Sequence, residues 1–545
     1  MVQTETAPTA TLAVTHSGAE QAIAALEAHG VETVFGIPGV HTLALYDALL
    51  DSPIRHVLAR HEQGAGFMAD GYARATGRPG VAVIITGPGI TNVATPIGEA
   101  YADSSPVFVL SSNVERAYVD RMRGSLHDLK DQLGVMAAVT QWNTRANAAA
   151  AVYGAVAEGF RRLGTGRPRP VHVEIPLDVL DERAEDDDLA VSLPAALRPN
   201  PRLLRDAADR LKRAKRPLLY CGGGAVTANA GPHVLAIAER LGAPVLTSTM
   251  GKGSVSEDHP LVVGALWGAG NAVDALLRET ECLVVFGSKL GAQDTHDFTM
   301  PLCRELIRVD VDPDELILNA QPSLGIVGDA ALAAEGIATL LAGEDFRGDG
   351  FGASQVQAAK HDARANAFGA DRLPYLDALR RAVPRDGIVA WDMTMMSYAA
   401  IGLFPAYEPR TFQFPAGYGT LGYALPAAIG AKIGRPDTAV VAVCGDGGFQ
   451  FTMQEVATAV SERLGLPIVI FNDSTYSAVK DAQRSSRDGR YLAVDLINPD
   501  YVALARAYAI PGVRAESPAA LEAAVVEALE RDLPTIIDVP IAGWV

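Results

Sequence analysis

Short apolar runs alternate with longer segments of helical period along almost the whole chain. VETVFGI (31–37) and VAVIIT (81–86) have the β-branched composition of buried strands, and HTLALYDALL (41–50) has the period of a helix. A further helix is expected from Glu62 to Thr76. Strands and helices that alternate in this way predict doubly wound parallel sheets, which places the chain in the α/β fold class.

Two segments lack both periods and divide the chain into three α/β units. ERAEDDDLAVSLPAALRPNP (182–201) is acidic and then proline-rich, and GEDFRGDGFGASQVQ (343–357) is rich in glycine and charge, so we interpret both as linkers. The predicted domains are residues 12–183, 200–342 and 370–545. The first and third share a strand, a glycine-rich turn and a helix of comparable lengths, which indicates an old duplication.

Composition narrows the class of protein. The 64 acidic residues exceed the 46 basic ones, and a net charge of −18 repels nucleic acid. Apolar runs are interrupted well before the ~18 residues that a membrane helix needs, so we expect no membrane partner. The start MVQTETAPTATLAVTHSG lacks the basic and apolar regions of a secretory signal, which favours a cytoplasmic location. The cysteines form no CxxC pair and are expected to be free thiols: Cys221, Cys282, Cys303 and Cys444.

The stretch AVCGDGGFQF (442–451) places one acid among glycines where a strand ends and a helix begins. Open α/β sheets bind ligands at the carboxyl ends of their strands, and the start of the following helix presents free amides to an anion. Gly447 and Gly448 would let a phosphate approach the backbone, whereas Asp446 tolerates a phosphate only through a divalent cation. Taken alone, the motif is more often a tight turn with a helix-capping Asp than a phosphate site.

A second acid supports the cation. The next strand, PIVIF, ends in Asn472 and Asp473, 27 residues after Asp446. Neighbouring parallel strands would bring both acids to one edge of the sheet, where they would raise each other's pKa unless Mg²⁺ bound both. The sequence therefore predicts a magnesium site at this edge.

This GDGG…ND pattern is similar to the cofactor motif of thiamin-diphosphate enzymes of the acetolactate synthase, pyruvate decarboxylase and benzaldehyde lyase superfamily. The resemblance implies that Asp446, Asp473 and the backbone carbonyl of Thr475 bind Mg²⁺, although the family usually has Asn where this chain has Asp473. It also implies the family's fold, with pyrimidine-binding, central and diphosphate-binding domains.

Other segments match the same family and together span nearly the whole chain. RHEQGAGFMADGYAR (60–74) contains Glu62, which by the resemblance hydrogen-bonds N1′ of the aminopyrimidine and so activates C2 of the thiazolium. TGPGITN (86–92) follows as in the family. An isolated Glu at this place would instead be a solvated residue in the first turn of a helix.

GYGTLGYALPAAIGA (417–431) resembles the segment that bends the cofactor into a V. Leu421 would be the apolar wedge, and the carbonyl of Gly419 would bind the 4′-amino group. The remaining predicted cofactor contacts are Thr394, Gly447, Gly448 and Tyr476.

The family's reaction is the formation of a carbanion/enamine from a 2-oxo acid on the cofactor, and the sequence indicates its course less clearly. His41 and His127 both follow strands and are predicted to relay protons to the reacting carbonyl, although each is also compatible with a surface or capping histidine. Val479 stands where pyruvate decarboxylases have a glutamate, which disfavours that activity.

The segments VFGIPGVHTLALYDALL and LHDLKDQ are similar to bacterial 5-guanidino-2-oxopentanoate decarboxylases. The resemblance implies a thiamin-diphosphate- and Mg²⁺-dependent decarboxylase of that 2-oxo acid, with Asp128, Asp131 and Tyr476 as candidate partners of the guanidinium group. The alternative is a carboligase like acetolactate synthase or benzaldehyde lyase. A non-catalytic protein on the same scaffold is disfavoured by the intact Glu62.

Two further expectations concern cofactors and partners. GALWGAGNAVDAL (264–276) and GSKLGAQDT (287–295) differ from the segments around FAD in acetolactate synthases, so FAD is not expected. Glu62 and Asp446 lie in different domains, and in the family these come from two chains. The resemblance therefore implies a homo-oligomer, dimer or tetramer, with active sites between chains.

Overall fold

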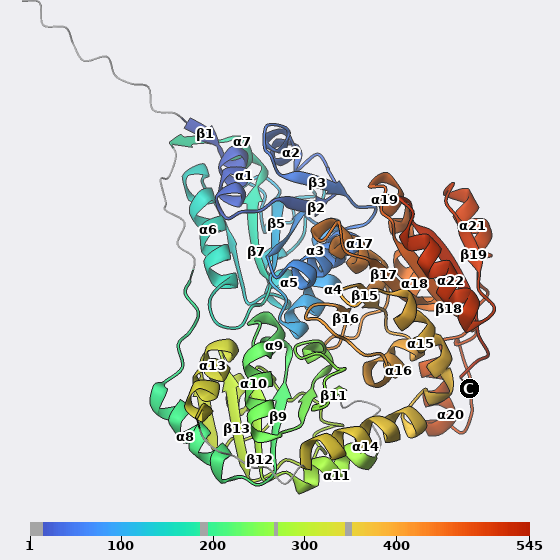
Figure 1. The fold of residues 1–545 in the computed structure, drawn as a ribbon. Helices are drawn as coiled ribbons and strands as arrows, with labels where there is room; N and C mark the ends of the chain where they lie inside the picture. Colours follow the sequence, from blue (N-terminus) through green and yellow to red (C-terminus); the bar gives the residue numbers. More distant parts are fainter. Residues whose placement is uncertain (1–14, 186–193, 266–270, 344–350, 545) are drawn as a thin grey trace, which may run out of the picture.

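Three parallel sheets of six strands, each covered by helices, make up the molecule (Figure 1). The computed structural model describes residues 15–185, 194–265, 271–343 and 351–544. The central strands are buried along their whole length, as expected for parallel sheets covered on both faces. The predicted α/β class with doubly wound sheets is confirmed.

The N-terminal domain contains the first sheet and a short antiparallel pair formed by β1 (Thr15–Ser17) and β8 (Arg183–Glu185). The strands of its sheet, in spatial order, are β3 (Arg55–Leu58), β2 (Thr33–Gly36), β4 (Gly80–Ile84), β5 (Val107–Asn113), β7 (Val171–Pro176) and β6 (Trp142–Arg145). Its helices are α1 (Gly18–Ala28), α2 (Leu43–Leu50), α3 (Glu62–Thr76), α4 (Pro88–Asp103), α5 (Gln132–Ala137), α6 (Val152–Leu163) and α7 (Leu177–Asp181).

The central domain contains the second sheet. Its strands, in spatial order, are β11 (Val262–Ala265), β10 (Val245–Thr247), β9 (Pro217–Cys221), β12 (Cys282–Phe286), β13 (Glu305–Asp310) and β14 (Leu324–Val327). Its helices are α8 (Pro201–Arg213), α9 (Gly223–Thr227), α10 (Gly231–Leu241), α11 (Asn271–Glu279), α12 (Glu315–Leu318) and α13 (Ala330–Leu341).

The C-terminal domain contains the third sheet. Its strands, in spatial order, are β16 (Phe412–Gln413), β15 (Ile388–Trp391), β17 (Val440–Gly445), β18 (Pro467–Asn472), β20 (Thr535–Pro540) and β19 (Gly512–Arg514). Its helices are α15 (Leu373–Ala382), α16 (Met395–Leu403), α17 (Ala424–Gly434), α18 (Asp446–Thr452), α19 (Val456–Ser461), α20 (Ser477–Ser486), α21 (Tyr501–Ala507) and α22 (Pro518–Leu529). Helix α14 (Phe351–Asn366) precedes them and contacts α11 and β11 of the central domain as well as α16.

The outer two domains share one topology. When the strands of each sheet are numbered in chain order, the N- and C-terminal sheets both follow the order 2-1-3-4-6-5, whereas the central sheet follows 3-2-1-4-5-6. In the outer sheets the order reverses next to β4 and β17, and ligands of open α/β sheets bind at such a reversal. The shared topology fits the duplication expected from the sequence.

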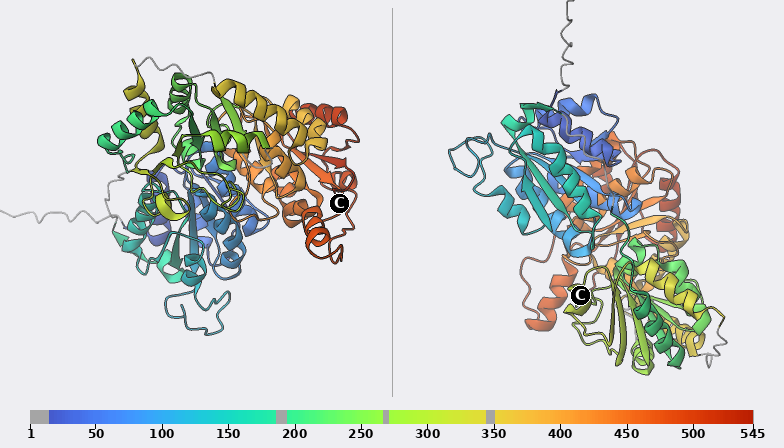
Figure 2. Two further views of the ribbon diagram at one scale, coloured as in Figure 1. Left: turned by 90° about the horizontal axis from the view of Figure 1, so that it is seen from below. Right: turned by 90° about the vertical axis from the view of Figure 1, so that its left-hand side faces the viewer.

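The N- and C-terminal domains pack together through α3 and α17 (Figures 1 and 2). A side chain on Gly71 would overlap the backbone of Ala427, and one on Gly430 would overlap the backbone of Met68. These glycines therefore let the two helices approach closely, and one apolar cluster continues from α3 into β17 and β18. The central domain, green to yellow in the figures, lies against both.

Two predicted linkers contain regular structure in their described parts. Arg183–Glu185 forms β8, since it completes a two-stranded ladder with β1. Residues 351–357 begin α14, whose buried side chains Val356, Ala359 and Ala363 recur at helical spacing, a period that the glycines before them conceal. The rest of both linkers, residues 186–193 and 344–350, lies outside the described residues, and the exact domain limits stay predictions.

The free thiols expected from the sequence are confirmed for all four cysteines, of which Cys303 is only partly buried. Among the described residues, no helix combines the length and the apolar composition needed to cross a bilayer.

Candidate active site at two sheet edges

Asp446 and Asp473 meet at the carboxyl edge of the C-terminal sheet. Asp446 opens α18 directly after β17, and Asp473 follows β18, the parallel neighbour of β17. Only 3% of Asp446 is exposed, and burial raises its pKa to about 6, with the charge of Asp473 adding to the effect. Burial also raises the pKa of Asp473. The predicted juxtaposition of the two acids is therefore present.

Asn498 is a residue of this site that the sequence did not indicate. Its amide donates to Oδ2 of Asp446 at 2.6 Å and to Oδ1 of Asn472 at 3.0 Å. The hydroxyl of Ser477 donates to the other acid, Asp473. Asn498 lies 52 residues after its partner in a segment without regular structure, so no periodic pattern marks it.

The turn around Asp446 is packed so closely that its glycines are required. A Cβ on Gly447 would lie 2.5 Å from the ring of Tyr476, and one on Gly445 would lie 2.9 Å from the hydroxyl of Thr394. Two of the predicted cofactor contacts, Thr394 and Tyr476, therefore lie beside the turn. Thr475 lies two residues after Asp473, and its amide donates to that carboxylate at 3.3 Å.

Asp392 connects this turn to the segment that contains Leu421. Its carboxylate accepts the amides of Met393 at 2.8 Å and Gly422 at 3.0 Å, and a Cβ on Gly448 would approach it to 3.1 Å. Burial raises the pKa of Asp392 to about 6. Leu421 is half-buried, and Gly419 has φ 74°, a conformation that only glycine adopts without strain.

The two carboxylates of Asp446 and Asp473 fit two of the ligand positions around a magnesium ion. Two carboxylates at one strand edge, with pKa values raised by burial, form a site that a cation would stabilise. No cluster of three or more His, Cys, Asp or Glu suited to a metal occurs in the described part of the chain, so further ligands would have to be backbone or ligand oxygens. Mg²⁺ commonly binds in that way, with few protein side chains and the oxygens of a phosphate.

Glu62 is at the first position of α3 in the N-terminal domain. Its Oε2 accepts the amide of Asn92 at 2.9 Å, and Asn92 belongs to α4, the helix that follows the TGPG turn. The N-terminus of α3 is joined to the C-terminal domain by Glu455, whose carboxylate accepts the amides of Arg60 and His61 at 3.0–3.1 Å. Asn92 and Glu455 were both missed, because each meets its partner across the fold.

His41 and His127 lie together. Their rings stack with centroids 5.1 Å apart and an angle of 26° between planes. Burial and the neighbouring His127 lower the pKa of His41, so His41 is neutral at neutral pH and able to accept a proton. Three buried atoms here have no hydrogen-bond partner among the described residues: Nδ1 of His41, Nδ1 of His127 and Oδ1 of Asp128. Such atoms favour a polar ligand at this place.

A buried network supports the backbone beside these histidines. Oε1 of Gln132 accepts the hydroxyl of Thr86 at 2.7 Å and the amide of Gly87 at 3.0 Å, while its amide donates to Glu174 at 2.9 Å. Gly87 has φ 67°, and a side chain there would overlap the carbonyl of His127. Gln132 therefore fixes the turn against which His127 lies, and nothing in its sequence context indicated this.

The contacts of Glu62 and of the two histidines lie within the N-terminal domain. Those of Asp446 and Asp473 lie within the C-terminal domain. The structure of one chain thus contains two groups of predicted site residues on two sheets of equal topology.

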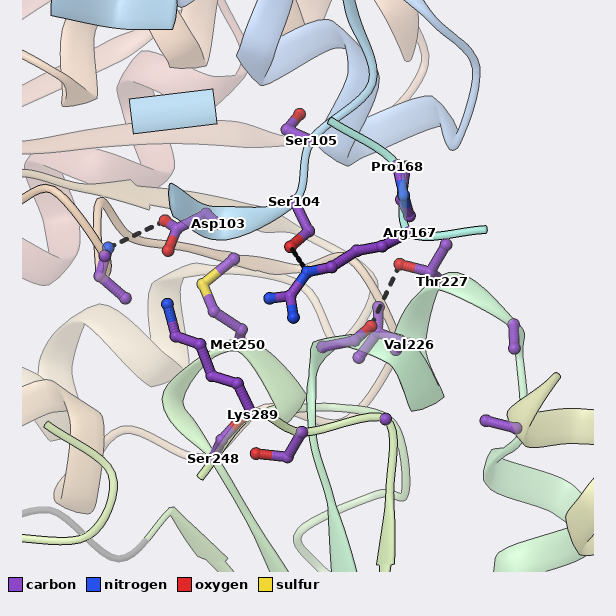
Figure 3. A pocket seen from close by; sticks show the side chains of 18 of the residues that line it. Asp103, Ser104, Ser105, Arg167, Pro168, Val226, Thr227, Ser248, Met250 and Lys289 are labelled. Carbon is purple, nitrogen blue, oxygen red and sulfur yellow. Dashed lines mark hydrogen bonds between the residues drawn. The ribbon is translucent and has the colours of Figure 1, made fainter. Parts of the chain in front are cut away.

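A cavity of about 390 Å³ lies where the three domains meet (Figure 3). It opens at the carboxyl edge of the central sheet, and Lys289 and Asp103 line it from different domains. Arg167 donates to the hydroxyl of Ser104 at 2.6 Å on the same wall. The expectation that FAD does not bind stays a prediction, part of which concerns residues 266–270 outside the described chain.

Comparisons with known proteins match three segments of the chain to one family. Models of the thiamine pyrophosphate (thiamin diphosphate) enzymes match three segments: the N-terminal TPP binding domain at residues 16–135, the central domain at 204–337 and the C-terminal TPP binding domain at 392–539.

Similar curated proteins cover almost the whole chain. A probable 2-ketoarginine decarboxylase of Pseudomonas aeruginosa, AruI, is 41% identical over 93% of this chain and 89% of its own. A probable acetolactate synthase large subunit of Methanocaldococcus jannaschii is 32% identical over 96% of this chain and 92% of its own. The acetolactate synthase large subunit of Corynebacterium glutamicum is 34% identical over 96% and 86%.

Proposed function

Because the chain belongs to the thiamine pyrophosphate enzyme family, we propose that it is a Mg²⁺-dependent decarboxylase of a 2-oxo acid, with 5-guanidino-2-oxopentanoate (2-ketoarginine) as its substrate. The observation that carries the proposal is the 41% identity, over 93% of the chain, to the probable 2-ketoarginine decarboxylase of Pseudomonas aeruginosa. The reaction would release CO₂ and leave 4-guanidinobutanal.

The C-terminal edge would bind the metal and the diphosphate. Asp446, Asp473 and the backbone carbonyl of Thr475 would be the ligands of Mg²⁺, and Gly447 and Gly448 would leave room for the diphosphate. The raised pKa of Asp446 supports this role, since a buried carboxylate beside another acid is stabilised by a cation. Thr394 and Tyr476, which lie beside the turn, would contact the diphosphate.

The N-terminal edge would act on the other end of the cofactor. Glu62, oriented by Asn92, would exchange a proton with the pyrimidine N1′. Gly419 would accept a hydrogen bond at its carbonyl from the 4′-amino group, and Leu421 would press the two rings together. When bound, thiamin diphosphate supplies an electron sink for the electron pair left by CO₂.

His41 and His127 would handle the proton at the substrate. The neutral His41 can accept a proton, and its free Nδ1 leaves one ring position available for the substrate. Stacking against His127 orients both rings toward the same place. Proton transfer by such positioned groups contributes about 10²–10⁴-fold to a rate.

Asp128 is the better of the candidate partners for a guanidinium group. Its Oδ1 is buried without a hydrogen-bond partner in the described structure, next to His127 in the chain. Asp131, by contrast, caps α5 by accepting the amide of Gly134 at 2.7 Å. A guanidinium pairs well with a carboxylate oxygen that lacks other donors.

The second candidate is a carboligase that joins the intermediate to another carbonyl compound. The observation that favours it is the identity of 31–34% to several acetolactate synthase subunits, over more than nine-tenths of the chain. In that case pyruvate would be the donor and acetolactate the product.

The proposal includes an oligomer with active sites between chains, because the resemblance to the family implies that the two groups of residues come from two chains. A dimer is its minimum and a tetramer is compatible with it. The cytoplasmic location and the absence of FAD, both expected from the sequence, belong to the same proposal.

The test is a product assay with thiamin diphosphate and Mg²⁺. We expect CO₂ and 4-guanidinobutanal from 2-ketoarginine. Acetolactate from pyruvate would select the carboligase instead, and no CO₂ from either 2-oxo acid would overturn both.

A second test concerns the substrate's guanidinium group. Asp128→Asn should raise KM for 2-ketoarginine about tenfold or more and leave KM for 2-oxopentanoate, which lacks the guanidinium, unchanged. Asp131→Asn is the matched control, because Asn also caps a helix. Equal losses for both substrates would remove Asp128 from substrate recognition.

A further inference from the structure

The segment from Ala416 to Thr420 lies against the second half of α4. A Cβ on Gly417 would lie 2.7 Å from the Cβ of Ala102, and one on Gly98 would lie 3.0 Å from the ring of Tyr418. The outer side of the segment is exposed at Gly417 and Tyr418. This segment of the C-terminal domain is therefore seated on a helix of the N-terminal domain.

Two carboxylates of α4 accept alternate backbone amides of the segment. Oδ2 of Asp103 accepts the amide of Ala416 at 3.0 Å. The two oxygens of Glu99 accept the amides of Tyr418 at 3.4 Å and Thr420 at 3.3 Å. Because residues four apart lie on one face of a helix, Glu99 and Asp103 form a row that faces the alternate amides of the segment, which begins with a turn at 416–418. Figure 3 shows Asp103 on the wall of the cavity with a hydrogen bond to its carboxylate.

Glu99 lies among other buried charged groups. The guanidinium of Arg74 donates to Asp70 at 2.8 Å and to Asp103 at 3.1 Å. One cation thus faces three buried acids, with the hydroxyl of Tyr423 also nearby. Burial, and then the charge of Asp103, raise the pKa of Glu99 to about 9, so this carboxyl keeps its proton at neutral pH.

A protonated carboxyl suits this position better than an amide. It has two oxygens for the two amides of the segment and one proton for a hydrogen bond to Asp103. A glutamine has a single acceptor oxygen, so one of the two amides would face an NH₂ group.

We propose that Glu99 and Asp103 are positioning residues that fix the segment 416–420 by its backbone amides. The segment contains Gly419 and precedes Leu421, so α4 sets the position of both against the cofactor. This consequence rests on the proposed function, whereas the contact itself does not.

The first test is hydrogen–deuterium exchange of the full-length protein without cofactor. Glu99→Leu removes both acceptors and should speed exchange in the peptide that contains residues 416–420 by about tenfold or more. Glu99→Gln should give a smaller increase. The control Glu335→Gln, at an exposed position of α13, should exchange like the wild type. Wild-type exchange in both Glu99 variants would overturn the proposal.

The second test is the pH profile of kcat. Wild-type kcat should fall above pH ~9, since loss of the proton places another charge beside Asp103 and Asp70. Glu99→Gln cannot lose a proton there, so its kcat should be reduced severalfold with KM little changed, and the alkaline fall should move to higher pH. An unchanged alkaline limb in Glu99→Gln would contradict the protonated form.

The two tests separate this inference from the proposed function. Altered exchange in a protein that binds no thiamin diphosphate would support the seating of the segment and overturn the proposed activity. An active wild type with unaffected exchange in the Glu99 variants would do the reverse. Should Glu99→Leu fail to fold, the isosteric Glu99→Gln still decides both measurements.

Discussion

The N- and C-terminal sheets share one strand order and also one polar trio. In each sheet an Asn at the end of the fourth strand donates to an acid on the sixth, which also pairs with an Arg on the fifth. The acid is paired in register with the residue two positions before the Asn in both sheets. The equivalent trios are Asn113, Glu174 and Arg145 in the first sheet and Asn472, Asp538 and Arg514 in the third.

The two sheets differ in what adjoins the trio. In the N-terminal sheet, Gln132 connects Glu174 to the amide of Gly87, so the turn after β4 is bonded by the protein itself. In the C-terminal sheet, Asn498 connects Asn472 to Asp446, an acid at the equivalent turn after β17. The turn after the third strand is therefore hydrogen-bonded by a glutamine in one domain, whereas in the other it carries the buried Asp446 next to the partly buried Asp473. The difference fits the proposed function, in which the N-terminal half would act on the pyrimidine and the C-terminal half would bind Mg²⁺.

Glu62→Gln should have the largest effect on activity, through the N-terminal half of the site. The amide cannot exchange a proton with the pyrimidine, so kcat should fall by about 10²–10⁴-fold while thiamin diphosphate still binds. Steady-state kinetics and calorimetric titration check this, with Glu335→Gln as the control. Full activity in Glu62→Gln would remove this residue from the mechanism.

Asp446→Asn should impair the binding of Mg²⁺ and thiamin diphosphate rather than the chemical step. Loss of a charged ligand should weaken Mg²⁺-dependent uptake of thiamin diphosphate by about 10–100-fold, which equilibrium titration would measure. Asp473→Asn is the matched variant, and its effect should be smaller, because an Asn carbonyl oxygen can also bind Mg²⁺. Equal affinity of the wild type and Asp446→Asn would argue against a metal at this edge.

The two trios should differ in their contribution to stability. Glu174 is fully buried and the side chain of its partner Arg145 is 15% exposed, whereas that of Arg514 is 50% exposed. Breaking a buried pair costs about 3–5 kcal/mol and an exposed one about 1 kcal/mol or less. Denaturant unfolding should therefore show a larger loss of unfolding free energy for Glu174→Gln than for Asp538→Asn. The reverse order would show that exposure of the Arg side chain does not determine how much each trio contributes to stability.

A smaller effect concerns pH at the acidic pair. The folded pKa of Asp446 is raised from its usual 3.8 to about 6. Between these values the metal-free folded protein binds a proton that the unfolded chain has released, so this group's contribution to stability falls as pH rises through the window. In the same window Mg²⁺ competes with that proton, and the Mg²⁺ concentration for half-maximal activity should rise as pH falls below ~6. Asp446→Asn should remove the stability slope, and a slope that persists would assign it to another group.

Local sequence patterns predicted the secondary structure and the arrangement of neighbouring strands well. The span of α3, the fold class and the meeting of Asp446 with Asp473 follow from periodicity and from the geometry of parallel strands. The helix expected after the glycine-rich turn at 445–448 is interrupted, because a 3₁₀ turn at Met453–Glu455 separates α18 from α19.

Contacts between distant parts of the chain were beyond such patterns. Gln132 meets Gly87 over 45 residues, and Glu99 meets Thr420 over 321 residues. Each is an ordinary polar residue in its own segment. Only the tertiary fold brings these groups to the atoms that they satisfy, so no spacing along the chain reveals them.

The central claim is that Glu62 of one chain and Asp446 of another serve one active site. Co-expression of Glu62→Gln with Asp446→Asn tests it most directly, since neither variant alone has a complete site. If the sites lie between chains, random assembly should restore roughly one quarter of the wild-type decarboxylation rate, because that share of sites combines an intact Glu62 with an intact Asp446. A mixed protein no more active than the two separate variants would contradict the claim.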